Sequence, residues 1–211
     1  MNRNGREYRV VSRRAFLGAA GAGTVALAGC IAGGGGSSAD PTLTDDPPVR
    51  GDPDADVTLE VYEDFSCPHC RSYNLQDLPA VAERYLEPGL IRYEHRDFPF
   101  LDDQSWQAAN AAREAYREHG DEAFWEYKSQ LFVRQNDVGT GAPEIFGDIA
   151  SNLDLDSETI QAAAEERRHD DILSGDKNRG EEYGVSGTPS FVLDGELVEG
   201  NLFAEIDAAL R

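Results

Sequence analysis

The stretch DVTLEVYEDFSCPHCRSY, Asp56 to Tyr73, joins two secondary-structure patterns at a pair of cysteines. Up to Phe65 it is rich in β-branched and aromatic residues, which predicts a strand. From Pro68 to Tyr85 apolar residues recur at helical spacing, which predicts a helix. Cys67 is therefore expected where the strand passes into the helix. Pro68 suits the first helical position, because its missing N–H would have no partner there.

The two cysteines of this stretch, Cys67 and Cys70, enclose Pro68 and His69. A sulfur at a helix N-terminus lies near free backbone N–H groups and the positive end of the helix dipole, which favour a thiolate over a thiol. His69 adds a donor and, when protonated, a positive charge. A disulfide that closes so short a loop removes little chain entropy and stabilises a fold weakly. The pattern favours a disulfide that exchanges.

A metal site and an inert disulfide are the competing interpretations of this pair. A zinc or iron site of this type needs two such pairs, and the third cysteine, Cys30, lies far away near the N-terminus. His95, His119 and His169 are scattered without ligand spacing, and each is expected at the surface or partly packed. We therefore predict that the protein holds no metal and no cofactor.

The rest of the chain predicts an α/β fold. LIRYEHRDFPF, Leu90 to Phe100, alternates like a strand, and the stretch from about 104 to 183 is nearly all helical. TPSFVLDGELVEGN, from Thr188, predicts two short strands around a turn at Asp194-Gly195, followed by a helix over 203–210. The order is β-α-β, a block of helices, then β-β-α. Its first unit should be a right-handed crossover between parallel strands.

A strand, then F-x-C-P-H-C at a helix start, a helical block and finally GVSGTPSFVLDG (184–195) resemble the DsbA-like thiol–disulfide oxidoreductases of the thioredoxin superfamily. The resemblance runs from about Asp56 to Arg211. It implies a thioredoxin fold over residues 55–211, with an inserted helical subdomain at about 103–183.

The resemblance also implies roles for the matching residues. Cys67 would be the attacking and leaving thiol, and Cys70 the resolving one. Thr188-Pro189 would carry a cis-proline that faces the active site and offers backbone groups to an extended substrate. Pro68-His69 resembles the oxidising members, so the expected activity is oxidation of protein thiols, with a quinone-linked membrane oxidase as the recycling partner. The alternatives are a disulfide reductase or isomerase, and a lipid-anchored binding protein whose cysteines are redox-idle.

One position departs from the family pattern. Many relatives place a buried acid six residues before the first active-site cysteine, where it relays a proton to the resolving thiol. Here that position is Val61. Glu60 should point to the opposite face of the sheet, whereas Glu63 shares the parity of Val61 but lies nearer the motif. Water or Glu63 is left as the replacement for the missing acid.

The first fifty residues are predicted to direct export and membrane attachment, and not to form part of the folded domain. Residues 1–29 combine Arg13-Arg14 with a mildly apolar Gly/Ala-rich run, which resembles a twin-arginine export signal. LAGC, ending at Cys30, resembles a lipobox, so we expect lipidation of Cys30 and an extracytoplasmic, lipid-anchored protein. Residues 30–54 are too polar and too rich in Gly, Pro and Asp to pack a core, and predict a flexible tether. A general secretion signal, an uncleaved anchor and an unmodified Cys30 are the alternatives.

The chain carries a formal net charge of −21. Residues 1–29 hold five of the 19 basic side chains and one of the 40 acidic ones, so the remainder has a net charge of −25. Such a body repels nucleic acid, which we exclude as a partner. Lys128 and Lys177 are the only lysines. An acidic, lysine-poor composition of this kind is typical of proteins adapted to high salt, where cations screen the repulsion.

Overall fold

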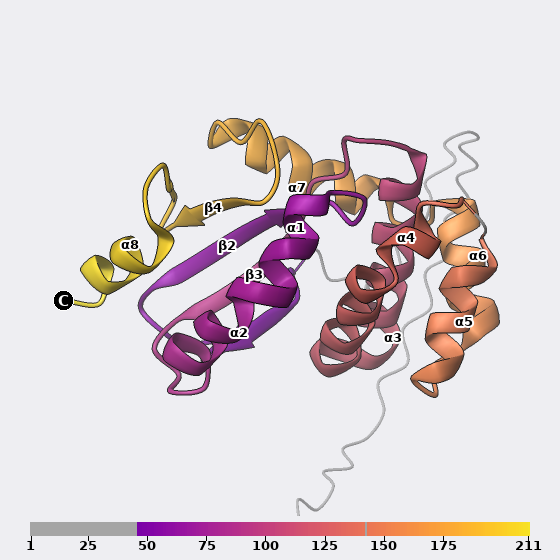
Figure 1. Cartoon of the computed structure of the whole chain (residues 1–211), viewed down its shortest axis with the longest axis horizontal. Coiled ribbons are helices and arrows are strands. Elements are labelled where there is room, and N and C mark those ends of the chain that lie inside the picture. The colour runs from indigo at the N-terminus through magenta and orange to yellow at the C-terminus, as the bar shows by residue number, and fades with distance from the viewer. Residues whose placement is uncertain (1–45, 142) are drawn as a thin grey trace, which may run out of the picture. The chain divides into compact units, whose positions relative to one another are not determined.

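The computed structural model describes residues 46–141 and 143–211, and the predicted export signal and Cys30 lie outside them (Figure 1). Within the described residues, a five-stranded sheet has the order β1-β3-β2-β4-β5. Its strands are β1 (Val49–Gly51), β2 (Thr58–Glu63), β3 (Arg92–Asp97), β4 (Ser190–Leu193) and β5 (Glu196–Leu197). From β2 onward the predicted order of β-α-β, helices and β-β-α is confirmed, and β1 precedes it.

The first unit is the expected parallel crossover. β2 and β3 pair in parallel from Thr58 opposite Arg92 to Glu63 opposite Asp97. The chain between them winds along one face of the sheet as a single helical path with two segments of π-helix (Figure 1). Its parts are α1 (Pro68–Ser72), η1 (Tyr73–Asp77), α2 (Leu78–Val81) and η2 (Ala82–Leu86).

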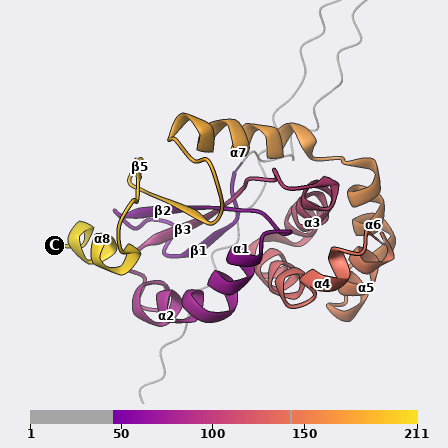
Figure 2. The same ribbon diagram turned by 45° about the horizontal axis from the view of Figure 1, so that its top comes forward.

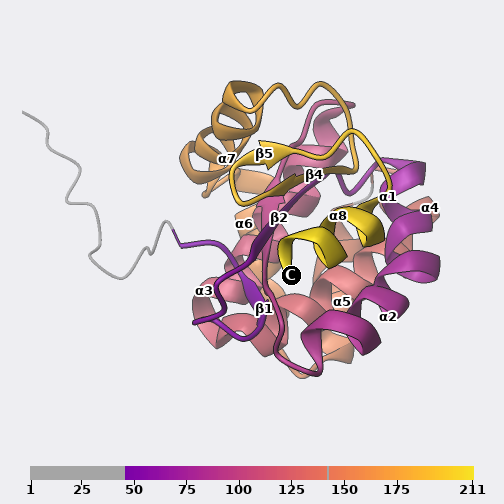
Figure 3. The same cartoon turned by 90° about the vertical axis from the view of Figure 1, so that its left-hand side faces the viewer.

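The C-terminal hairpin extends the same sheet. β4 pairs antiparallel with β2 and with β5. The turn between β4 and β5 places Asp194 at φ 48° and Gly195 at φ 86°, the left-handed conformation that this dipeptide adopts readily. Helix α8 (Leu202–Ala209) then lies beside η2, where the Tyr85 hydroxyl donates to the Asp207 carboxylate at 2.9 Å (Figure 3).

Five helices stand between β3 and β4. They are α3 (Asp103–Val133), α4 (Gln135–Val138), α5 (Glu144–Asn152), α6 (Ser157–Glu166) and α7 (Asp170–Glu182). α3 is interrupted at Gly120, whose φ of 79° breaks the helical path. α3 to α6 gather at one side of the sheet, as Figure 2 shows. They form the inserted helical subdomain that the sequence predicts.

Helix α7 covers the sheet face opposite α1 and α2 (Figure 2). The approach is close at Gly180, where an added Cβ would lie 2.8 Å from the Tyr62 ring and 3.0 Å from Phe98. A glycine is therefore required for this contact between helix and sheet. Tyr62, Phe98, Val185 and Val192 form a small apolar cluster on this face.

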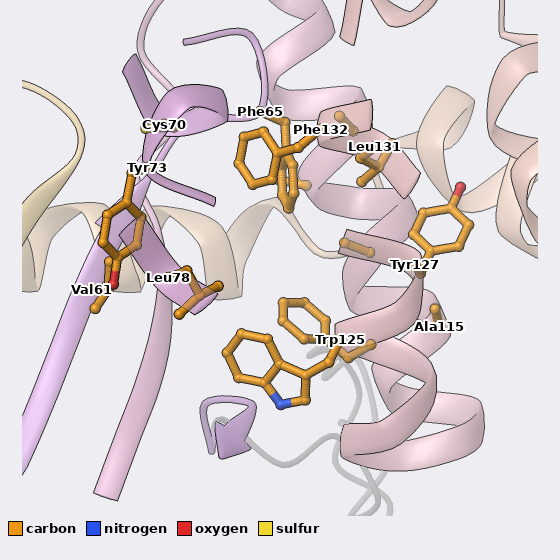
Figure 4. Packing of buried hydrophobic residues seen from close by; sticks show 14 of the residues in the cluster. Val61, Phe65, Cys70, Tyr73, Leu78, Ala115, Trp125, Tyr127, Leu131 and Phe132 are labelled. Atoms are coloured by element: carbon orange, nitrogen blue, oxygen red, sulfur yellow. The ribbon is translucent and has the colours of Figure 1, made fainter. Parts of the chain in front are cut away.

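The larger core fills the space between the other sheet face, the α1–η2 path and α3. Phe65 packs against Phe132 at 5.1 Å between ring centroids, and Tyr73 points toward the sheet near Val61 (Figure 4). Trp125 lies closer to the N-terminus of α3 than Phe132 does (Figure 4). This packing fixes α3 against the segment that carries the two cysteines.

The predicted tether, residues 30–54, extends too far toward the C-terminus. Its last part contains β1, which pairs antiparallel with β3. The Trp125 indole donates to the Val49 carbonyl at 2.9 Å, and the Val49 N–H donates to Asp121 at 2.6 Å. The polar composition of residues 30–54 gave no sign of β1, because this strand is held in place by contacts with residues more than 40 positions away. None of the described helices is long and apolar enough to cross a membrane.

Candidate active site

Cys67 lies at the start of α1, as its N-cap residue, with extended backbone angles (φ −76°, ψ 120°). Pro68 follows in the first turn, where no N–H is required. The Gln135 side chain, from α4 in the helical subdomain, donates to the carbonyls of Phe65 and Cys67 at 2.8 and 2.9 Å. The subdomain thus holds the backbone on which Cys67 sits.

Asp64 joins the loop that precedes Cys67 to the segment that follows β3. Its carboxylate accepts from the Ser66 N–H at 2.7 Å and from the N–H groups of Phe100 and Leu101 at 2.9 and 3.2 Å. The Ser105 hydroxyl also donates to it at 2.7 Å. The segment between β3 and α3 is therefore held against the loop that precedes Cys67.

Thr188, which precedes Pro189, lies against the same sulfur although it is more than 100 residues away in the chain. The Thr188–Pro189 peptide bond is cis. The Cys67 Sγ donates to the Thr188 carbonyl at 3.2 Å. The Thr188 hydroxyl is buried, and no hydrogen-bond partner for it is found among the described residues. The structure thus brings together all the predicted site residues on the two motifs, CPHC and Thr188-Pro189.

The surroundings of Cys67 favour its thiolate. Its pKa is lowered from 9.0 to about 5, chiefly by the hydrogen bond from the Cys70 thiol. The neighbouring Thr188 side chain and the backbone N–H groups of Cys70 and His69 lower this pKa further, and together these groups outweigh the cost of desolvation. The N–H contributions come from the free groups at the start of α1, where the sequence placed Cys67.

Cys70 lies in the opposite kind of environment. Its side chain is fully buried, and burial raises the pKa of its thiol far above 9.0. The hydrogen bond to Cys67 and the negative charge of Glu63 raise that pKa further. Both cysteines are free thiols in the structure. The surroundings of the two sulfurs therefore favour a thiolate at Cys67 and a protonated thiol at Cys70.

His69 is exposed on the first turn of α1. Its backbone N–H is one of the donors that lower the pKa of Cys67. Whether its imidazole adds to this effect stays a prediction.

Glu63 is the buried acid on the sheet face that Val61 shares. Val61 is completely buried and apolar, whereas Glu60 points to the other face and pairs with Arg179 at 2.8 Å. The Glu63 carboxylate is fully buried and contacts Asn74, Lys128 and His95. It is thus a buried carboxylate two residues from the expected position, on the same face of the sheet.

The expectation that the histidines lie at the surface or are partly packed is wrong for two of them. His95 is completely buried on β3, and His169 is 4% exposed, with its ring against Glu114. Their partners come from other elements, which sequence spacing does not show. Among the described residues, no group of three or more His, Cys, Asp or Glu side chains is arranged to hold a metal ion.

Sequence reasoning also missed the residues that support the cysteines from a distance. They are Asp64, Asn74, Lys128 and Gln135. One signal was available: Lys128 is one of only two lysines in the chain. It stands in an apolar stretch of a helix, where an unpaired charge would be costly.

Comparisons with known proteins agree with this arrangement. The chain is 25% identical over 163 residues to disulfide bond formation protein D of Bacillus subtilis, which covers 76% of this chain and 72% of that protein. The fold of this chain matches the crystal structure of oxidised BdbD from Bacillus subtilis with a TM-score of 0.70 and 23% sequence identity, over 78% of this chain and 90% of the other. It also matches MdbA, a thiol-disulfide oxidoreductase from Corynebacterium diphtheriae, with a TM-score of 0.64 and 27% identity, over 79% and 91% of the two chains.

A thioredoxin family model matches residues 43–210, a range that contains every strand of the sheet and both motifs of the site. Because this match extends over most of the sequence, the chain belongs to the thioredoxin family.

Proposed function

We propose that this protein is an extracytoplasmic thiol–disulfide oxidoreductase that oxidises the thiols of protein substrates through a Cys67–Cys70 disulfide. The observation that carries the proposal is the contrast within the pair, a Cys67 thiol with a pKa of about 5 beside a buried Cys70 whose pKa is raised. A stabilised thiolate favours the reduced form, which makes the disulfide a stronger oxidant.

The chemistry proceeds in two exchanges. A substrate thiolate attacks the Cys67 sulfur, a bond between the two sulfurs forms, and the Cys67–Cys70 bond breaks. Cys70 leaves with the electron pair and takes up a proton. A second substrate thiolate then attacks the substrate sulfur of the mixed disulfide, and Cys67 leaves as a thiolate. Two electrons pass from the substrate thiols to the cysteine pair, and the substrate gains one disulfide.

Cys67 suits both of its roles in this reaction, as the sulfur that is attacked and as the thiolate that leaves. A sulfur with a low pKa is a good leaving group, because its thiolate needs no proton at neutral pH. The Cys67 side chain is 5% exposed whereas that of Cys70 is completely buried, so an external thiolate reaches Cys67 first.

The surface beside Cys67 fits an unfolded protein chain. Phe100 and Leu101 are 41% and 47% exposed, and Asp64 holds their backbone next to the loop before Cys67. They offer apolar contacts for side chains of a partly folded substrate. Pro189 and Thr188, at the sulfur itself, offer backbone groups to an extended segment.

The names of the relatives support this reaction class. One is a disulfide bond formation protein and another is a thiol-disulfide oxidoreductase. The twin-arginine-like signal and the lipobox-like LAGC support export and attachment through Cys30 to the outer face of the cell membrane. A membrane-bound, quinone-linked oxidase that takes electrons from the reduced pair would complete the cycle.

The test is a comparison of Cys70→Ser and Cys67→Ser. Cys70→Ser should accumulate mixed disulfides with reduced protein substrates, and mass spectrometry of the peptides should place them on Cys67. Cys67→Ser should form none, because Cys70 is buried and protonated. Stable trapping through Cys70 would overturn the assignment of the two thiols, and a wild-type pair that fails to exchange would support the redox-idle binding protein.

Whether the protein oxidises or reduces its substrates is tested by the reduction potential of the Cys67–Cys70 pair, measured by equilibration with glutathione. We expect the disulfide to be reduced at glutathione ratios that leave a structural disulfide intact. A strongly reducing potential would instead favour a reductase.

A further inference from the structure

His95 lies between two carboxylates in the interior of the protein. Its Nδ1 is 3.2 Å from Glu63 Oε2, and its Nε2 is 3.0 Å from Asp97 Oδ1. All three side chains are completely buried. Glu63 comes from β2, and the other two residues come from the adjacent strand β3. We refer to Glu63, His95 and Asp97 as the carboxylate–histidine trio.

The trio has a place for one proton beyond those of a neutral histidine. A neutral imidazole has one N–H and one bare nitrogen, so it can donate to one carboxylate only. The other contact would set two lone pairs against each other in a buried site, which is unfavourable. A second proton between His95 and a carboxylate removes this conflict. The geometry therefore gives the trio two states, one with a single histidine proton and one with a proton at each contact.

The trio is next to the resolving thiol. The Asn74 side chain donates both to Glu63 and, at 2.8 Å, to the Cys70 carbonyl. The negative charge of Glu63 also raises the pKa of the Cys70 thiol. Asn74 and Lys128, two direct partners of Glu63, also line a pocket of about 230 Å³. This volume holds several water molecules, so protons can be exchanged with solvent there.

We propose that His95 is a positioning residue that stores the proton which Cys70 gains and loses in each cycle, with Glu63 as the link between them. This inference rests on the proposed function. When the disulfide opens, the electron pair leaves with the Cys70 sulfur, and a proton passes from the trio to that sulfur. When Cys70 attacks a mixed disulfide on Cys67, the Cys70–Cys67 bond forms, the partner sulfur leaves as a thiolate, and the Cys70 proton returns to the trio.

Other charged groups set the background of this transfer. α3 contributes Lys128, which contacts Glu63, and Arg113, which contacts Asp97 at 2.6 Å. Asp176 of α7 pairs with Arg113 and accepts from the Asp97 N–H at 3.2 Å. The remaining neighbours of the His95 ring are the aromatic rings of Phe65, Phe124 and Trp125. These fixed cations favour the ionised form of Glu63 and Asp97, so the bare nitrogen of a neutral imidazole is the place in the trio for a further proton.

The proposal is tested by the reaction of the reduced protein with DTNB in a stopped-flow instrument. In a first phase, the Cys67 thiolate displaces one coloured thiolate and forms a mixed disulfide. In a second phase, Cys70 attacks Cys67 and releases the other coloured thiolate. The second phase requires removal of the Cys70 proton, whereas the first does not. The rate of the first phase is therefore an internal control in each protein.

In the wild type, the rate of the second phase should rise with pH and level off within about pH 5.5 to 9, once the trio is free to accept a proton. In His95→Gln, that rate should be at least tenfold lower at pH 7. It should continue to rise about tenfold per pH unit, because hydroxide must then remove the proton. The first phase should be unchanged.

Tyr127→Phe is the matched control. Tyr127 lies on α3, the helix that also carries Lys128 and Arg113. The substitution removes the buried hydrogen bond of 2.9 Å from the Tyr127 hydroxyl to the Phe146 carbonyl and leaves the trio unchanged. Its second phase should keep the wild-type rate and pH profile. This control separates a general loss of stability from the loss of a proton store.

A second phase in His95→Gln with the wild-type rate and profile would overturn the inference and leave the proposed function intact. A wild-type protein that shows no second phase would contradict the proposed function instead. If His95→Gln does not fold, the wild-type profile decides. A rate that rises tenfold per pH unit up to about pH 9 without levelling off means that Cys70 loses its proton to hydroxide, which excludes the trio as acceptor.

Discussion

Cys67 should stabilise the folded, reduced protein in a pH-dependent way, and Cys67→Ser should remove that dependence. Folding lowers the pKa of the Cys67 thiol from 9.0 to about 5, so the unfolded chain binds more protons at this sulfur in the range between. A lowered folded-state pKa contributes stability that is fully present above the unfolded pKa and is lost as the pH falls through the folded pKa. For Cys67 this window runs from about pH 9 to about pH 5.

The size of the effect follows from the position of pH 7 in this window. It lies about two units above the folded pKa of about 5, and one unit corresponds to about 1.36 kcal/mol. The thiolate should therefore add about 3 kcal/mol to the free energy of unfolding of the reduced protein at pH 7, and almost nothing at pH 5. That is a large part of the 5–15 kcal/mol that is usual for a domain, about a quarter of its middle value.

Urea unfolding followed by circular dichroism measures this contribution. The wild type and Cys67→Ser, both kept reduced, are compared at pH 5, 6 and 7 in constant salt. All other titrating groups are shared, so their effects cancel in the difference between the two proteins.

The difference should grow by somewhat more than 1 kcal/mol for each pH unit as the pH rises from 5 to 7. The same measurement on the oxidised wild type should show no such growth, because the disulfide has no thiolate. A difference that is constant from pH 5 to 7 would mean that the fold does not favour the Cys67 thiolate, and the reasoning behind the site would fail.

Three further predictions concern other parts of the chain. His69→Ala should raise the pKa of Cys67, followed as thiolate absorbance near 240 nm against pH; an unshifted pKa would remove the imidazole from the mechanism. Cys30→Ser should release the protein from the membrane fraction or leave an unprocessed precursor, and unchanged retention and mass would exclude lipidation. Thermal unfolding should occur at a lower temperature in 0.1 M than in 1 M KCl, because the Debye length grows from about 3 to about 10 Å and acidic side chains repel more strongly. A transition that ignores salt would contradict this.

Local patterns were sufficient to predict the elements that carry the chemistry. The change from strand to helix at Cys67, the proline after it and the Asp194-Gly195 turn are each encoded within a few residues. These signals also give the order of elements, and the family resemblance then supplied the pairing of the CPHC motif with Thr188-Pro189.

The support around the cysteines could not be predicted in the same way. Lys128 meets Glu63 across 65 positions of sequence, and Trp125 holds Val49 across 76. Such contacts depend on how α3 packs against the sheet, which no local pattern specifies. For the same reason the sequence could not show that His95 is buried, since its two carboxylate partners become neighbours only when β2 and β3 pair in register.

The short outer strands have a consequence for how this protein behaves among its own substrates. A sheet edge with free N–H and C=O groups is a template on which another chain can form an added strand. At one edge, β1 covers β3 with three residues and is itself held down by the indole of Trp125; at the other edge, β5 has only two residues. An unfolded client bound near Cys67 therefore finds little exposed backbone to pair with, so the enzyme can hold an aggregation-prone chain without seeding its aggregation.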